Sequence, residues 1–125
     1  STQAKTLFPY TTLFRSDLFM QLVRERLHGH GLTIVTPADP ARRGSQVSLA
    51  RDEGAYAIVQ ALIARGVIGD FRAGDGHSEP DLLRFGLTPL YLGFAEVWQA
   101  VEHLRQVLES GEWREARFAR QHAVT

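Results

Sequence analysis

Residues 83–91 read Leu-Arg-Phe-Gly-Leu-Thr-Pro-Leu-Tyr, an apolar run that contains one arginine and is stopped by a proline. The apolar and aromatic residues are typical of a β-strand, and a proline cannot donate a hydrogen bond to a neighbouring strand. The guanidinium of Arg84 has to reach water or an anion, because a buried charge without a partner is costly. A lone arginine of this kind is most often a solvated edge residue or half of a structural salt bridge. The function of the chain depends on what Arg84 faces.

The chain around this stretch alternates between helical and strand-like patterns. Apolar residues at helical spacing predict helices at residues 17–28, 52–66 and 94–111, and a short helical segment at 113–120. Ile63, Phe94 and Trp98 belong to these apolar stripes and are expected to face the core. Short apolar or alternating runs predict strands at residues 32–36, 45–49 and 67–72, in addition to the strand that bears Arg84. This order, with turn-rich links, predicts an α+β fold: a mostly antiparallel sheet of about four strands covered by helices on one side.

Size and composition exclude several classes of protein. The 125 residues suffice for one domain with a core, and the formal net charge of zero gives no footprint of a nucleic-acid or anionic-membrane partner. No apolar run approaches the roughly 20 residues that span a bilayer. The absence of cysteine excludes disulfides, thiolate nucleophiles and zinc–thiolate sites, and fits a cytoplasmic protein. Lys5 is the only lysine, so chemistry that needs an amine for a Schiff base has no other candidate here.

No metal or phosphate site is evident from the spacing of residues. His28 and His30 stand at a glycine-rich helix end, where histidines are more often cations near the helix C-terminus than metal ligands. Gly74 and Gly76 lack the strand–loop–helix context of a phosphate-binding loop. We therefore expect no metal site and no catalytic acid–base pair in the chain.

The first residues are expected to be foreign to the domain. Residues 7–16 read Leu-Phe-Pro-Tyr-Thr-Thr-Leu-Phe-Arg-Ser, which resembles the in-frame translation of a sequencing-library adapter. We therefore interpret residues 1–16 as a non-native leader and residues 17–125 as the domain. The alternative is a genuine β-like arm, since Thr, Tyr, Phe and Leu suit strands.

Six stretches, taken together and in order, resemble the C-terminal part of the kynureninases, pyridoxal-phosphate enzymes of the fold-type I, aminotransferase class V group. They are residues 31–37, 42–48, 56–64, 65–72, 83–91 and 118–125. The resemblance implies a small C-terminal domain whose large, cofactor-binding domain is missing from this chain. It also implies hydrolysis of L-kynurenine, or 3-hydroxykynurenine, to anthranilate, or 3-hydroxyanthranilate, and L-alanine. The resemblance further implies a place in tryptophan catabolism and NAD biosynthesis, and a cytoplasmic homodimer when the protein is full length.

The same resemblance assigns one site residue. The arginine that binds the substrate carboxylate in the family matches Arg84, whereas no position matches the cofactor lysine or the aspartate that pairs with the pyridine nitrogen. We therefore expect Arg84 to bind substrate, pyridoxal 5'-phosphate to be bound by the missing domain, and the fragment alone to be inactive. A guanidinium suits this role because it offers a carboxylate two parallel hydrogen bonds.

One departure and two alternatives accompany the resemblance. Residues 74–79 form an apparent insertion relative to the family, and His77 within it is expected to be solvent-exposed. The first alternative is the small domain of another class V pyridoxal enzyme, such as a cysteine desulfurase. The second is a free-standing α+β interaction module in which Arg84 is a plain structural cation.

Overall fold

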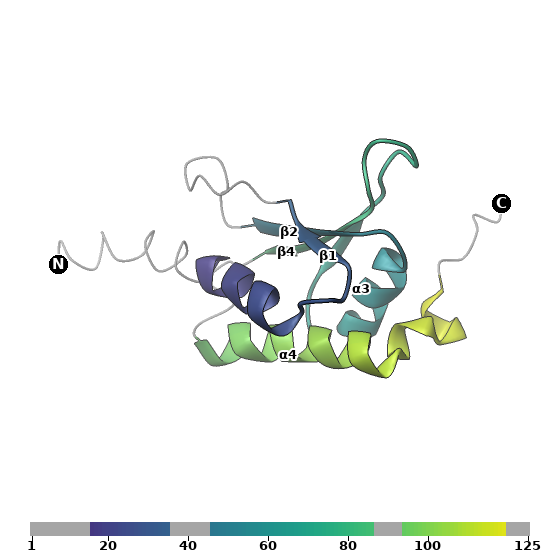
Figure 1. Cartoon of the computed structure of the whole chain (residues 1–125). Helices are drawn as coiled ribbons and strands as arrows, with labels where there is room; N and C mark the ends of the chain where they lie inside the picture. Colours follow the sequence, from purple (N-terminus) through teal and green to yellow (C-terminus); the bar gives the residue numbers. More distant parts are fainter. Residues whose placement is uncertain (1–15, 36–45, 87–93, 120–125) are drawn as a thin grey trace.

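A computed structural model describes residues 16–35, 46–86 and 94–119 of the chain (Figure 1). After a first helix at residues 16–26, the elements are β1 (Leu32–Ile34), β2 (Gln46–Arg51), α3 (Ala55–Ala64), β3 (Asp70–Arg72), β4 (Leu82–Gly86) and α4 (Phe94–Ser110). Two 3-10 turns follow, at Glu112–Arg114 and Ala116–Phe118, where the sequence predicts a short helical segment. Apart from Ser16, the expected leader lies outside the described residues, as does Pro89.

The four strands form one antiparallel sheet in the order β1-β2-β4-β3. Strand β4 is central: it pairs with β2 on one side and with β3 on the other. The register places Arg84 opposite Ser48 of β2 and opposite Asp70 of β3. The predicted α+β fold with a four-stranded antiparallel sheet is confirmed.

All three long helices cover the same face of this sheet. Figure 1 shows the first helix, α3 and α4 on one side of the strands. Alternate residues of a strand point to opposite faces, and in β4 Leu83 and Phe85 are fully buried while Arg84 is only partly buried. Leu83 and Phe85 therefore point into the core under the helices, and Arg84 projects from the face that the helices leave uncovered.

The core is one cluster of apolar side chains between the sheet and the helices. Its largest members with less than 2% exposure are Phe19, Phe85, Leu49, Ile58, Leu62, Leu83 and Leu104. The rings of Phe19 and Phe85 lie 5.1 Å apart, so the first helix packs directly on β4. This packing fixes the backbone of the strand that carries Arg84.

Three residues predicted for the apolar helix stripes are exposed instead. Trp98 and Phe94 of α4 are 44% and 61% exposed, and Ile63 of α3 is 48% exposed. The stripe prediction was wrong for Trp98 because the residues of α4 that do face the core are Val97, Ala100, Val101, Leu104, Val107 and Leu108. The guanidinium of Arg26 lies over the Trp98 ring, 4.3 Å from its centre, and shields part of it from water.

The strand predicted at residues 67–72 is shorter than expected. Strand β3 begins only at Asp70; Val67 is buried before it, and Ile68 is 71% exposed. The backbone N–H of Val67 bonds to the carbonyl of Leu62, at 2.9 Å, and so completes the end of α3. Residues 65–69 are therefore a connection that follows the helix end rather than a strand edge.

Candidate functional site

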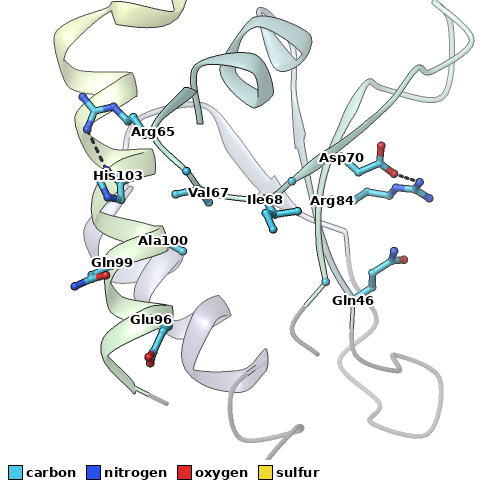
Figure 2. A pocket seen from close by; sticks show the side chains of 13 residues that line it. Gln46, Arg65, Val67, Ile68, Asp70, Arg84, Glu96, Gln99, Ala100 and His103 are labelled. Carbon is cyan, nitrogen blue, oxygen red and sulfur yellow. Dashed lines mark hydrogen bonds and ion pairs between the residues drawn. The ribbon is translucent and has the colours of Figure 1, made fainter. Parts of the chain in front are cut away.

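Arg84 pairs with an acid across the β3–β4 hairpin. Its Nη2 donates a hydrogen bond to Oδ2 of Asp70, the residue directly opposite it in the register. The Arg84 side chain is 28% exposed and that of Asp70 is 60% exposed. Figure 2 shows both side chains pointing away from α4, on the uncovered side of the sheet. Among the described residues, the anion that Arg84 meets is thus a carboxylate at the surface.

Among the described residues, the guanidinium of Arg84 uses one of its hydrogen-bond donors. It carries five N–H donors, and the hydrogen bond it makes to the described residues is the one from Nη2 to Asp70. The Nε atom is buried and has no hydrogen-bond partner in this part of the chain. A partly exposed ion pair of this kind contributes only about 0–1 kcal/mol to stability. The pair therefore contributes little to the stability of the fold.

Arg65 differs from Arg84 because all three nitrogens of its guanidinium donate hydrogen bonds. Its Nε and Nη2 donate to the two carboxylate oxygens of Glu112, at 3.1 and 2.6 Å, and its Nη1 donates to Gln106, at 2.7 Å. The same Nη1 lies 3.1 Å from Nδ1 of His103, which must accept because a guanidinium can only donate. Hydrogen bonding to Arg65 lowers the pKa of Glu112 from its usual value. Arg65 thus ties the end of α3 to α4 and the turn after it.

A cavity of about 520 Å³ lies beside the hairpin, between the connection before β3 and α4. Its apolar lining includes Val67, Ile68 and Ala100, and α4 adds Glu96, Gln99 and His103. Arg84 and Asp70 lie at its border. Since their charged ends point away from α4 (Figure 2), the cavity and the ion pair face different directions.

The structure describes no amine that can anchor pyridoxal phosphate. The only lysine, Lys5, lies outside the described residues. The described residues therefore do not fit the covalent site of that cofactor.

No metal cluster or membrane helix occurs in the part of the chain that the structure describes. No group of three or more His, Asp or Glu side chains there is placed to hold a metal ion. His30 lies 4.0 Å from Glu109, and His77 is exposed, with its backbone N–H bonded to Asp75 at 2.8 Å. No helix in residues 16–35, 46–86 and 94–119 is long and apolar enough to cross a membrane.

Asp70 is the residue that sequence reasoning missed. The sequence places it two positions before Arg72 in a predicted strand, with nothing to distinguish it from other surface acids. Its partner is set by the β3–β4 register, which depends on the conformation of the nine-residue loop 73–81 between the strands. A hairpin alignment of residues 67–72 with 82–86 is the signal that would have pointed to it.

Comparison with known proteins supplies the family. The family model of the kynureninase C-terminal domain matches residues 12–104, so its match begins inside the segment interpreted as a leader. Kynureninase from Pseudomonas fluorescens is 50% identical over 114 residues, which are 91% of this chain and 26% of that protein. Kynureninases from Burkholderia mallei (strain SAVP1) and Burkholderia pseudomallei (strain K96243) are 49% identical over the same shares. The chain thus spans about a quarter of the length of these relatives, with 26% covered, and it belongs to the kynureninase C-terminal domain family.

Proposed function

We propose that this chain is the C-terminal domain of a kynureninase that hydrolyses L-kynurenine, or its 3-hydroxy form, to anthranilate, or 3-hydroxyanthranilate, and L-alanine. Membership of the family supports the class of enzyme. The observation that carries the site is Arg84, a guanidinium on the uncovered face of the central strand with hydrogen-bond donors to spare. Its proposed role is to bind the α-carboxylate of the substrate.

The geometry of a guanidinium explains why this role matters for the reaction. A planar fork holds a carboxylate through two parallel hydrogen bonds, and so fixes the direction of the substrate as well as its position. Each hydrogen bond to a charged group is worth roughly 1.5–3 kcal/mol. Correct orientation accounts for much of the rate that an enzyme gains from binding. Placing the arginine on a strand that packs on Phe19 keeps its backbone fixed during binding.

Pyridoxal 5'-phosphate supplies the electron sink of the proposed reaction when it is bound. Because the described residues contain no lysine, its covalent anchor has to come from another part of the enzyme. We accordingly propose that this domain binds the carboxylate end of the substrate and that a larger preceding domain binds the cofactor. From the resemblance to kynureninases, we also propose that the full-length enzyme is a cytoplasmic homodimer and that the isolated fragment is inactive.

The test is an assay of the enzyme expressed from its gene, extended upstream of the codon for Asp17. We expect this enzyme to release anthranilate from L-kynurenine and no sulfide from L-cysteine, and the 125-residue chain mixed with pyridoxal phosphate to do neither. Release of sulfide alone would transfer the domain to the cysteine desulfurases. Full activity after Arg84→Ala would remove the site assignment and leave the rest of the proposal standing.

The ion pair with Asp70 favours one alternative, in which Arg84 is a structural cation of the hairpin. That role predicts that Arg84→Gln lowers the free energy of unfolding without changing the KM for kynurenine. The substrate-binding role predicts that Arg84→Gln raises the KM and changes the free energy of unfolding little, since a partly exposed ion pair contributes at most about 1 kcal/mol to stability. Chemical unfolding and steady-state kinetics of the same variant therefore separate the two.

A further inference from the structure

We infer that Asp70 is a positioning residue for Arg84: its carboxylate holds one side of the guanidinium and leaves the other side for the carboxylate of the substrate. This inference rests on the function proposed above. It starts from the register, because Asp70 stands directly opposite Arg84 and both project from the uncovered face of the sheet. Phe71, between Asp70 and Arg72, instead packs against the core.

The lengths of the two side chains explain why an acid is useful at this position. An arginine loses up to about 2 kcal/mol of rotamer freedom when it is ordered, whereas an aspartate has a short side chain whose place is largely set by the strand. The hydrogen bond from Nη2 to Oδ2 connects the flexible side chain of Arg84 to the short side chain of Asp70. The guanidinium is therefore ordered before a ligand arrives, and binding does not have to supply that cost.

The donors that remain point to the side where a ligand would bind. In Arg65, the edge formed by Nε and Nη2 is filled by both oxygens of Glu112. In Arg84, Nη2 donates to Asp70 and Nε is buried, so a ligand cannot use the edge formed by Nε and Nη2. Among the described residues Nη1 has no hydrogen-bond partner, and one of its hydrogens together with one hydrogen of Nη2 forms the other edge of the fork. That edge can donate two parallel hydrogen bonds to a carboxylate.

The exposure and the charge of the Asp70–Arg84 pair both affect how it can bind a second anion. Asp70 is 60% exposed and Arg84 is 28% exposed, so a small anion can reach the pair from solvent. Asp70 also neutralises the charge of Arg84, which weakens the attraction for a second anion. Asp70 thus has two opposed effects, orientation and charge, and we infer that orientation dominates.

Substitutions of Asp70 separate these effects in the full-length enzyme. Asp70→Ala removes the acceptor and the charge, and we expect kcat/KM for L-kynurenine to fall about tenfold, mostly through a higher KM, which corresponds to the loss of one ordered hydrogen bond. Asp70→Asn keeps an acceptor oxygen without the charge and should restore kcat/KM to within about threefold of the parent. A lower KM in both variants would show that charge dominates, and would overturn the inference.

A double-mutant cycle distinguishes positioning from a general structural effect. In an Arg84→Gln background, Asp70→Ala should change kcat/KM by less than about twofold, because there is no guanidinium left to orient. An equal loss in both backgrounds contradicts the inference. Asp52→Ala is the matched control, because it removes the same charge from an exposed acid that follows β2. If Arg84→Gln itself leaves KM unchanged, the substrate-binding role proposed for Arg84 has failed, rather than the role of Asp70 in positioning its guanidinium.

A measurement on the chain itself does not depend on the reaction. The ¹⁵N relaxation of the Arg84 Nε–H group reports how well the guanidinium is ordered on the nanosecond scale. We expect Asp70→Ala to increase its motion clearly, and the Nε–H of Arg65, bound to Glu112, to stay unchanged as an internal reference. Unchanged relaxation of Arg84 would overturn the positioning role whatever the enzyme assay gives.

Discussion

The indole ring of Trp113 lies against the backbone of Gly54, in the space that a Cβ atom on that residue would occupy. Gly54 precedes α3 with φ of 76°, a left-handed conformation. The guanidinium groups of Arg51 and Arg114 lie 5.0 and 4.9 Å from the centre of the ring and hold it in place. Two independent restrictions therefore act on this glycine, one from its backbone and one from its neighbour.

Gly54→Ala should lower the free energy of unfolding by roughly 2–4 kcal/mol. About 1–2 kcal/mol comes from the left-handed backbone and the rest from displacing a packed ring. Gly66→Ala is the control, because Gly66 has φ of 88° but nothing within 4 Å of its added Cβ, so only the backbone cost applies. Urea unfolding of both variants measures the difference. Equal losses would mean that the Trp113 contact adds nothing.

Replacing Arg84 should affect substrate binding in a graded way. In the full-length enzyme, Arg84→Gln should raise the KM for L-kynurenine about a hundredfold, the equivalent of two charged hydrogen bonds at the lower end of their range. Arg84→Lys keeps the charge but not the fork, and should raise KM by about tenfold. Steady-state kinetics with L-kynurenine checks both values, and Arg24→Gln, at an exposed position of the first helix, serves as the control. A lysine variant equal to the parent would exclude bidentate binding.

The Arg65–Glu112 pair should make stability depend on pH. Glu112 has a lowered pKa because Arg65 donates hydrogen bonds to its carboxylate. A carboxyl group with a lowered pKa in the folded state stabilises the fold above its unfolded pKa, and this contribution is lost as the pH falls through the folded value. Glu112→Gln should therefore cost about 1–3 kcal/mol at pH 7. The gap to the parent should shrink below the ordinary glutamate pKa of 4.5, and unfolding curves from pH 7 to pH 3 would show it. A gap independent of pH contradicts the prediction.

The loop between β3 and β4 should lose its order only in strong acid. The carboxylate of Asp75 accepts hydrogen bonds from the backbone N–H groups of Glu79 and His77, both at 2.8 Å, and from the hydroxyl of Ser78. These bonds lower the pKa of Asp75 to about 2. The loop contacts should thus be complete above the ordinary aspartate pKa of 3.8 and be lost as the pH falls through about 2. The amide chemical shift of His77, whose N–H bonds to Asp75, should titrate with that midpoint in acid and show no such step in Asp75→Asn. A midpoint near the ordinary aspartate pKa of 3.8 would contradict the contacts.

Arg26 should connect the first helix to α4 through its planar group. It lies over Trp98 and donates to Glu102 at 2.8 Å. A double-mutant cycle of Arg26→Ala and Trp98→Ala should give a coupling of about 0.5–1 kcal/mol, the usual value of a cation–π contact. Arg24→Ala, from the exposed side of the same helix, should give none. Equal coupling for Arg24 would show a general charge effect instead.

The spacing of apolar residues in the sequence was sufficient to predict the α+β architecture of the domain. The apolar run around Arg84 predicted a strand, and a strand is present there, with Leu83 and Phe85 buried on either side of the partly buried arginine. Side chains such as Trp98 escaped prediction because a long apolar side chain at the border of a helix stripe can be covered by a neighbouring cation as readily as by the core. Periodicity describes one element at a time and contains no information on such cross-helix contacts.

The partner of Arg84 could not be predicted for a related reason. A strand pattern shows which residues share a face, but which residues meet across two strands depends on the register, and here on the conformation of loop 73–81. Lys5 is the opposite case, because a simple count of lysines already showed that the chain offers no other amine for a Schiff base. Site chemistry that depends on composition is visible in a sequence, whereas site chemistry that depends on register requires coordinates.

Because the helices cover only one face of the sheet, consecutive residues of β4 lie alternately in the core and on the uncovered face. Leu83 and Phe85 are part of the buried core, while Arg84 between them, the proposed substrate-binding residue, is partly exposed. A substitution of Arg84 therefore leaves the core packing unchanged, so the proposed ligand preference at this position can change in evolution without a compensating gain in core stability.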